Sequence, residues 1–245
     1  MRIGAFTDKG KARDINEDCF FVSEFNLEDV FGYCIVADGM GGHNAGEIAS
    51  SLAIEEIKKY IKDFYHPDMT DQQVIGIMND SMSRANKTIY DKSLENQSYN
   101  GMGTTAIACI IYDKKIYIAH VGDSRAYLIH ESSISQITTD HSMIEELINS
   151  GSITREEAQN HPQKNIITRA LGGEENIPVD IHIQEYSEGD MIIMCTDGLS
   201  NMLTDLEILS VLKCRNHLQS AVEELISIAN DRGGLDNITV VALEF

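Results

Sequence analysis

The chain has 245 residues, of which 19 are Lys or Arg and 39 are Asp or Glu, so its formal net charge is -20 at pH 7. Because so acidic a chain repels polyanions, nucleic acid and anionic membrane surfaces are excluded as its main partners. A hydrophobic content of 42% is ordinary for a protein with a real core, and the 3 prolines form no Pro-rich linker. We therefore expect one globular domain over residues 1–245.

The start of the chain and its cysteines bear on the compartment. Met1-Arg2-Ile3 begins no signal-peptide apolar region, and the longest apolar run, 106–112, is far shorter than the ~20 residues of a membrane helix. The cysteines form no C-x-x-C pair and their number is odd, so we expect reduced core residues. They are Cys19, Cys34, Cys109, Cys195 and Cys214. We expect a cytoplasmic protein without a membrane partner, and a monomer.

The first half of the chain alternates between groups of strands and a pair of helices. Short apolar runs predict strands at 3–7, 19–23 and 33–37. Apolar residues then recur every three or four positions, which predicts one helix from about residue 44 and a second after Thr70. Further strands are expected at 104–112, 115–121 and 125–129, the first two joined by a hairpin turn at 113–114.

The second half begins with a long polar stretch, 140–178, in which Thr154 and Glu157 form a capping box for a short helix. An insertion of this length is usually functional or mobile. Two strands follow, at 179–185 and 191–196, and then a capping box of Thr204 and Glu207. The last elements are a helix with an apolar stripe and a strand that runs to the end of the chain. The stripe consists of Leu218, Val222, Leu225 and Ile226.

The order of these elements predicts the fold class. Strands come in blocks and so do helices, which favours an α+β fold with mostly antiparallel sheets. About ten strands exceed what one twisted sheet comfortably holds. We therefore predict two packed sheets whose outer faces are covered by helices.

Three aspartates lie at the ends of apolar strands. The run 33–37 ends at Asp38 and is followed by glycines, the run 191–196 ends at Asp197, and Asp236 precedes the run 238–243. Carboxylates gathered in one place repel one another and usually need a cation between them. Because the candidate ligands are oxygens and no His/Cys cluster has zinc spacing, we expect Mg²⁺ or Mn²⁺.

Other nearby groups fit such a centre. The carbonyl of Gly39 is a plausible ligand, since a residue without Cβ lets the backbone face an ion, and Glu17 and Asp18 would join through water. Two ions ~3.5–4 Å apart would activate a water and hold a phosphoryl group. Arg13 would then bind phosphate oxygens in a bidentate manner.

Each signal also has a simpler explanation. An Asp-Gly after a strand is usually a turn, and Arg13-Asp14 and Asp236-Asn237 fit loop and turn positions. The glycines at 39–42 resemble a nucleotide-binding loop, but Asn44 stands in place of the last glycine of G-x-G-x-x-G. No cysteine lies in a phosphate-binding loop followed by Arg, which argues against a cysteine-dependent phosphatase. The metal hypothesis therefore depends on the co-occurrence of the aspartates with Arg13.

A series of motifs runs along the whole chain. In order they are R-D-I-N-E-D at 13–18, V-A-D-G-M-G-G-H at 36–43 with Gly46-Glu47, G-M-G-T-T at 101–105, V-G-D-S-R at 121–125, T-D-H-S at 139–142, T-R-A-L-G at 168–172, C-T-D-G-L at 195–199 and D-N-I-T at 236–239. Together they resemble the metal-dependent protein serine/threonine phosphatases, the protein phosphatase 2C-like family, in its compact bacterial form. The resemblance implies a four-layer α-β-β-α sandwich with metals in a cleft at one edge of the sheets.

The resemblance also implies roles for individual residues. Asp38 would bridge two ions, with Glu17 and the Gly39 carbonyl on one of them. Asp197 and Asp236 would serve the other ion. Three further assignments are Asp123 with Asp197 at a third, weaker metal position, Arg13 as the phosphate-binding arginine, and Asp18, Asn237 and His43 as residues that support the ligands. The 140–178 insertion corresponds to the family's flap beside the active site, and the 101–105 and 122–125 segments resemble structural parts apart from Asp123.

One position departs from many eukaryotic members of the family, which carry a histidine directly after the Asp-Gly. Here that residue is Met40, whose thioether cannot donate a proton to a leaving alkoxide. A metal-bound water or His43 would take this role, although His43 equally fits a structural position at the start of a helix.

The expected reaction is hydrolysis of phosphoserine and phosphothreonine by a water held between two Mn²⁺ or Mg²⁺ ions, without a phospho-enzyme. Two alternatives stay open: a phosphatase for small phosphoesters or phosphotyrosine, and a catalytically silent phosphoprotein-binding module. The family's habit implies phosphoproteins as partners, together with a cognate serine/threonine kinase and its substrates.

Overall fold

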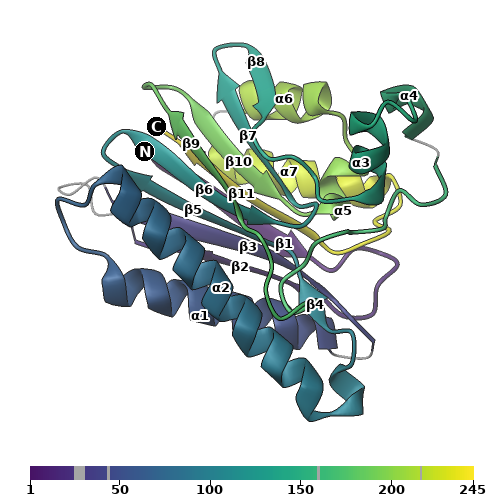
Figure 1. Cartoon of the computed structure of the whole chain (residues 1–245). Helices are drawn as coiled ribbons and strands as arrows, with labels where there is room; N and C mark the ends of the chain where they lie inside the picture. The colour runs from purple at the N-terminus through teal and green to yellow at the C-terminus, as the bar shows by residue number, and fades with distance from the viewer. Residues whose placement is uncertain (25–30, 43–44, 159–160, 216) are drawn as a thin grey trace.

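The computed structural model describes residues 1–24, 31–42, 45–158, 161–215 and 217–245 (Figure 1). Within these residues two antiparallel sheets pack face to face, with helices on both outer faces. The first sheet has the order β1 (Arg2–Asp8), β11 (Ile238–Glu244), β10 (Met191–Cys195), β7 (Arg125–His130) and β8 (Ser133–Gln136). The second has the order β2 (Asp18–Val22), β3 (Gly32–Met40), β5 (Ala106–Tyr112), β6 (Lys115–Val121) and β9 (Asp180–Glu185), and β4 (Gly103–Thr104) pairs with the end of β3.

Two long helices, α1 (Ala45–Phe64) and α2 (Asp71–Glu95), cover the second sheet (Figure 1). The first sheet is covered by α6 (Asp205–Cys214) and α7 (Leu218–Asp231). Shorter pieces are the 3₁₀ helix η1 (Gln97–Tyr99), α3 (Met143–Asn149) and α4 (Arg155–Ala158) in the predicted flap, and α5 (Asp197–Ser200). The predicted α-β-β-α layering is confirmed. None of the described helices combines the length and the hydropathy of a membrane-spanning segment.

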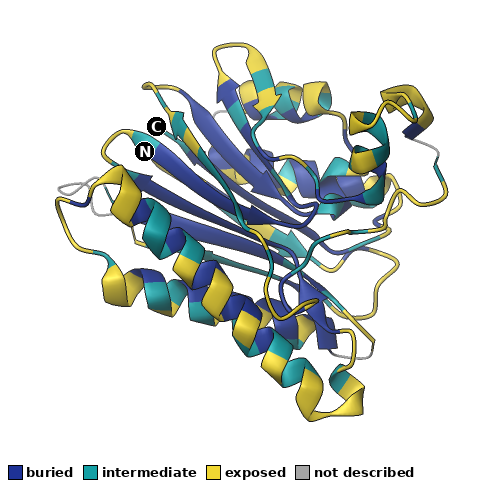
Figure 2. Ribbon diagram, viewed as in Figure 1, coloured by how far each residue is buried: buried dark blue, intermediate teal, exposed yellow. Residues whose placement is uncertain are grey.

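The hydrophobic core has three layers, because both faces of each sheet are covered (Figure 2). On β3, Ile35 and Ala37 contact the layer under α1 and α2, whereas Cys34 and Val36 contact the layer between the sheets. Side chains of a strand alternate between its faces, so a strand buried on both sides becomes a continuous apolar run. This burial explains why the run before Asp38 lacks an alternating polar pattern.

The predicted helix signals are largely present. Thr204 and Glu207 form the expected capping box at the start of α6, and Thr154 with Glu157 forms the one at α4. The structure adds a third, in which Thr70 and Gln73 cap α2. In the predicted strand 191–196, the last residue instead precedes α5, so Asp197 opens a helical turn rather than ending a strand.

The prediction that all cysteines are core residues is wrong for Cys214, which is exposed. Cys34, Cys109 and Cys195 are buried, and Cys19 is partly buried and packs against the core. Cys214 is the last residue of α6, where the helix leaves the core. All five are free thiols.

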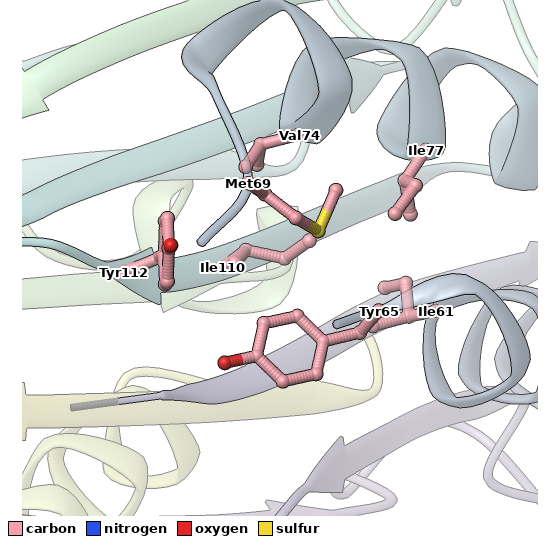
Figure 3. A pocket seen from close by; sticks show the side chains of 7 residues that line it. All are labelled: Ile61, Tyr65, Met69, Val74, Ile77, Ile110 and Tyr112. Carbon is pink, nitrogen blue, oxygen red and sulfur yellow. The ribbon is translucent and has the colours of Figure 1, made fainter. Parts of the chain in front are cut away.

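An apolar pocket lies where α1, α2, the loop between them and β5 meet (Figure 3). It is lined by Ile61, Tyr65, Met69, Val74, Ile77, Ile110 and Tyr112. Ile111 pairs with Gly32 at the start of β3, and Asp38 lies six residues further along that strand. At ~3.3 Å per residue this pocket is roughly 20 Å from the acidic strand end. It belongs to the packing of helices on the sheet.

Candidate metal centre

The register of the sheets brings the acidic strand ends together. Asp18 on β2 lies directly opposite Asp38 on β3. Burial raises the pKa of Asp38 well above its usual value, and the charges of neighbouring carboxylates add to the rise. These neighbours are Asp18, Asp197, Asp123 and Asp236. Residues from both sheets therefore form one acidic cluster, which we define as these five aspartates.

The cluster is electrostatically unfavourable on its own. Burial raises the pKa of Asp18 to about 7 and that of Asp123 to about 7, with a further contribution to each from the charge of Asp197. Burial and the charge of Asp236 raise the pKa of Asp197 to about 6. The carboxylates thus resist ionising together unless a positive charge is placed among them.

Several buried oxygens of the site lack a hydrogen-bond donor among the described residues. They are Glu17 Oε1, Asp18 Oδ1, Asp123 Oδ1 and Asp197 Oδ1. A buried acceptor without a partner costs about 1–3 kcal/mol. Hard oxygen donors without protein partners are what a divalent cation such as Mn²⁺ or Mg²⁺ requires. The residue types and their burial therefore fit the predicted ions.

The side chains are near one another without forming a finished ligand set. In the part of the chain that the structure describes, no three His, Cys, Asp or Glu side chains are arranged to hold a metal ion together. A cation placed among these carboxylates would offset the repulsion between their like charges.

Gly39 is required by close packing around the end of β3. A Cβ at Gly39 would lie 2.1 Å from the carbonyl oxygen of Gly46 and 2.7 Å from that of Glu17. A Cβ at Gly46 would in turn lie 2.4 Å from Glu17 Oε1. The sequence suggested glycine at position 39 so that its carbonyl could face an ion. The structure adds a steric reason, because α1 and Glu17 pack directly against this residue.

Glu17 is held in place through its backbone. Its N–H donates to Asn237 Oδ1 at 2.8 Å, and its carbonyl oxygen accepts from Ser50 Oγ at 2.6 Å and from the N–H of Gly39 at 3.2 Å. Burial raises the pKa of its carboxyl, although the positive charge of Arg13 and the N–H groups at the start of α1 act in the opposite direction. The predicted ligand thus connects β11, α1 and β3.

Asn237 fastens the loop that carries Arg13. Its Nδ2 group donates to the carbonyl oxygens of Lys9 and Ile15, each at 2.9 Å, while its Oδ1 accepts from Glu17. These bonds join the start of β11 to residues more than 200 positions away. Asn237 therefore joins Glu17 to the loop of Arg13 through contacts that the sequence did not show, and its role in supporting metal ligands stays a prediction.

Replacement of Asn237 by alanine should destabilise the protein by about 1–3 kcal/mol, because the buried N–H of Glu17 and two carbonyl groups lose their partner. Replacement by aspartate keeps the acceptor for Glu17 and loses the two donors, so an effect at least as large is expected in an already acidic cluster. Urea denaturation measures both effects. Unchanged unfolding midpoints would show that these bonds do not stabilise the loop.

Asp18 links the two sheets. Its Oδ2 accepts hydrogen bonds from the hydroxyl groups of Thr196, the residue after β10, at 2.9 Å and of Thr239, near the start of β11, at 2.7 Å. Its other oxygen is the unpartnered Oδ1 described above. One oxygen thus holds the layers together, while the other has no hydrogen-bond partner among the described residues.

Arg13 lies against a predicted metal ligand. Its Nη2 is 2.8 Å from Asp236 Oδ2, in an ion pair whose side chains are 48% and 32% exposed. An exposed pair of this kind contributes little stability, so it separates readily. The guanidinium predicted to bind phosphate is therefore held beside the acidic cluster and can be released from Asp236.

The backbone of Asp38 is held by two threonines that the sequence analysis treated only as structural. The N–H of Asp38 donates to Thr105 Oγ1 at 3.1 Å. Its carbonyl oxygen accepts from Thr104 Oγ1 and from the N–H of Thr105, each at 2.9 Å. In the sequence, only the Thr-Thr pair of the 101–105 motif pointed to this contact with Asp38.

A second contact that the sequence did not reveal is the bidentate pair of Arg125 with Asp140 at the base of the flap, with nitrogen–oxygen distances of 2.7–3.0 Å.

Two predicted roles concern residues near Gly39. Met40 is the last residue of β3 and pairs with Gly103 of β4. His43, the other candidate for proton donation, lies outside the described residues.

Known proteins resemble this chain over nearly its whole length. Residues 11–239 match the family described as Protein phosphatase 2C. The serine/threonine phosphatase stp of Listeria monocytogenes is 39% identical over 97% of this chain and 93% of its own length. The S. agalactiae serine/threonine phosphatase has a TM-score of 0.89 and 38% identity, covering 98% of both chains. The catalytic domain of the phosphatase PstP, solved with 2 manganese ions, has a TM-score of 0.85 and 31% identity over 99% of this chain and 97% of that one. The chain belongs to the protein phosphatase 2C family.

Proposed function

We propose that this protein hydrolyses phosphoserine and phosphothreonine in other proteins, with the acidic cluster as its catalytic centre. The observation that carries the proposal is the convergence, beside Arg13, of buried carboxylates with unpartnered oxygens. Membership of the family and the similarity to serine/threonine phosphatases over nearly the whole chain support a metal-dependent protein phosphatase.

The proposed ligands are those of the acidic cluster with its neighbours. Divalent ions held there would stabilise the charge on phosphoryl oxygens and lower the pKa of an attacking water. Asp38 would bridge two ions, Glu17 and the Gly39 carbonyl would complete one site, and Asp197 with Asp236 the other. Asp123 would form a third position together with Asp197. The manganese-containing structure of PstP supports two ions, of Mn²⁺ or Mg²⁺.

The chain's own groups would orient the substrate. Arg13 presents a planar guanidinium at the edge of the cluster, suited to two phosphate oxygens at once. Asn237 fixes the loop on which Arg13 lies, and Asp18 fixes the sheets behind it. Positioning and charge stabilisation account for most of the catalysis of phosphoryl transfer, so these supports are part of the proposed mechanism.

Replacement of Arg13 by lysine should lower kcat/KM for a phosphopeptide by roughly 10–100-fold, because lysine keeps the charge but loses the bidentate geometry. Alanine should cost more than lysine. Steady-state kinetics at saturating Mn²⁺ measure the effect. Equal activity of the lysine variant and wild type would mean that charge alone is needed.

A substrate panel separates the proposed function from its alternatives. Phosphate release would be measured from matched phosphoserine, phosphothreonine and phosphotyrosine peptides and from sugar and nucleotide phosphates, with increasing Mn²⁺. Faster release from the first two peptides supports the proposal, whereas preference for small phosphoesters contradicts it. Tight peptide binding without release would indicate a silent binding module.

The proposed function also implies a cellular compartment and partners. Free thiols at all five cysteines suit the reducing cytoplasm, where we place this chain as a monomer. A serine/threonine kinase of the same cell would supply the phosphoproteins that it hydrolyses. Loss of phosphate from proteins labelled by such a kinase, dependent on Mn²⁺ and on Asp38, tests this step.

A further inference from the structure

His141 has a central position that none of the roles above uses. It lies between β8 and α3, and its ring is buried. The backbone N–H of Gly122 donates to its Nδ1 at 3.0 Å, and its Nε2 lies 3.1 Å from Asp180 Oδ2. The ring stacks on that of His120, with centroids 4.7 Å apart. One side chain thus connects the turn after β6 with the first residue of β9.

The contacts determine which ring nitrogen carries the proton. A backbone N–H can only donate, so Nδ1 of His141 is the acceptor and has no proton. An imidazole cannot accept at both nitrogens, so the proton is on Nε2 and is donated to Asp180. Burial lowers the pKa of His141, which agrees with a neutral ring.

Asp180 is held for this purpose from its other side. Arg169 Nη1 donates to Asp180 Oδ1 at 2.7 Å. It also lies 2.9 Å from His141 Nε2, but both nitrogens carry protons in this tautomer, so Asp180 is the acceptor that the two groups share. Although partial burial acts in the opposite direction, hydrogen bonds from His141 and Arg169 lower the pKa of Asp180. An ionised carboxylate therefore faces Nε2 at neutral pH and fixes both the tautomer and the direction of the ring.

The turn that His141 holds has little freedom of its own. Besides the N–H bond, the carbonyl oxygen of Gly122 accepts from the N–H of His141 at 2.8 Å. Gly122 has a φ of 114°, and a Cβ there would lie 2.5 Å from Thr105 Cβ. On the other side of Asp123, the hydroxyl group of Ser124 forms a hydrogen bond with that of Thr105 at 2.7 Å. Asp123 is thus presented between two anchored residues, with its Oδ1 unpartnered.

We propose that His141 is a positioning residue that sets the Gly122–Asp123 turn, and with it the carboxylate of the third, weaker metal position. The inference rests on the proposed function, because it assigns that role to Asp123. His141 touches neither substrate nor ion. It acts by orienting the Gly122 amide, while Asp180 keeps its tautomer.

Two amide side chains separate the two ends of the ring. In His141→Asn, the Oδ1 atom takes the place of Nδ1 and still accepts from Gly122. In His141→Gln, the Nε2 amide takes the place of the ring Nε2 and still faces Asp180, but the acceptor for Gly122 is lost. A packing role would be impaired in both variants. A positioning role predicts damage in the glutamine variant only.

Three measurements report on the variants. Calorimetric titration with Mn²⁺ should show the weak binding phase reduced on the order of 10-fold in His141→Gln and within about twofold of wild type in His141→Asn. Hydrogen exchange of the Gly122 amide, followed by NMR without metal, should accelerate in the glutamine variant alone. Long-range ¹⁵N spectra should show the Nε2–H tautomer of His141 in the wild-type protein.

A second variant and a control keep the test decisive. Asp180→Ala removes a side chain that is 38% exposed, so it tests the tautomer without disturbing the core. This variant should weaken the same Mn²⁺-binding phase. It should also abolish the uniform Nε2–H signal of His141. If His141→Gln does not fold, this variant decides. His130→Gln, on the exposed end of β7, should match wild type.

Equal loss in His141→Asn and His141→Gln, or an Nδ1–H tautomer in the wild-type protein, would overturn the proposal. An Asp180→Ala variant with unchanged metal binding and an unchanged tautomer would also contradict it. Failure of the proposed function is recognised separately, as absence of Mn²⁺-dependent phosphopeptide hydrolysis by wild type. The exchange and tautomer measurements do not depend on that activity.

Discussion

Replacement of Asp38 by asparagine should abolish phosphopeptide hydrolysis and, at the same time, stabilise the metal-free protein. Asp38 is the residue whose charge is opposed by every other member of the acidic cluster. Its loss removes the proposed bridge between two ions, so we expect kcat/KM to fall by at least about 10³-fold. The amide keeps the shape of the side chain, so the hydrogen bonds of its backbone to Thr104 and Thr105 should persist.

The gain in stability has the same electrostatic origin. Burial and like charges raise the pKa of Asp38, which means that folding at neutral pH opposes its ionised form. Removing that charge should raise the free energy of unfolding by about 1–2 kcal/mol when EDTA is present. For a chain of this length the corresponding rise in Tm is roughly 2–8 °C. Such a trade of stability for function is common at active sites.

A matched substitution controls for the loss of a negative charge. Asp113 lies in the exposed hairpin turn between β5 and β6 with a φ of 47°, a conformation that asparagine tolerates well. Asp113→Asn should change neither activity nor Tm. A fully active Asp38→Asn enzyme would refute the proposed centre, and an inactive variant without added stability would refute the electrostatic explanation.

The second large effect should be the dependence of metal stabilisation on pH. The folded-state pKa values of Asp18 and Asp123, about 7, and of Asp197, about 6, exceed the ~3.9 of an unfolded aspartate. The folded metal-free protein therefore binds more protons than the unfolded chain between about pH 4 and 7. This contribution to stability is fully present below pH ~4 and is lost as the pH rises through the folded values.

The buried histidines act in the opposite direction. Burial lowers the pKa of His141, and it lowers that of His120 to about 3, below the ~6.5 of an unfolded histidine. The contribution of His120 to folding stability is complete above pH ~6.5 and is lost as the pH falls toward 3. Between pH 6.5 and 8 these histidines contribute no slope, so the acidic cluster should decide the trend there.

We therefore expect Mn²⁺ to raise Tm more at pH 8 than at pH 5.5, because protons compete for the same oxygens. At a concentration 100 times the Kd, stabilisation is about 2.7 kcal/mol, which corresponds to a Tm increase of roughly 5–10 °C. Calorimetry with Mn²⁺ or EDTA at both pH values measures it. An increase that is independent of pH, or one that persists in Asp197→Asn, would show that the ions bind elsewhere.

Local patterns in the sequence were sufficient for the layers of the fold. The buried strands, the hairpin at 113–114 and the capping boxes at Thr154 and Thr204 depend only on residues close in the chain. The edge strand β8 and the helix α5 were missed, because both are short and their sequences carry no strong period. The prediction that Cys214 is buried was wrong, because its position at the end of α6, and not its residue type, decides its exposure.

For the site, the sequence alone determined which residue types lie at the ends of buried strands, and the order of its motifs determined the family. Only the tertiary structure decided how those ends are held: Arg13 against Asp236, Asn237 across the loop to Glu17, and Asp18 between both sheets. These contacts join residues more than 170 positions apart. Their geometry depends on how the two sheets pack on each other, which is decided by contacts between residues far apart in the chain.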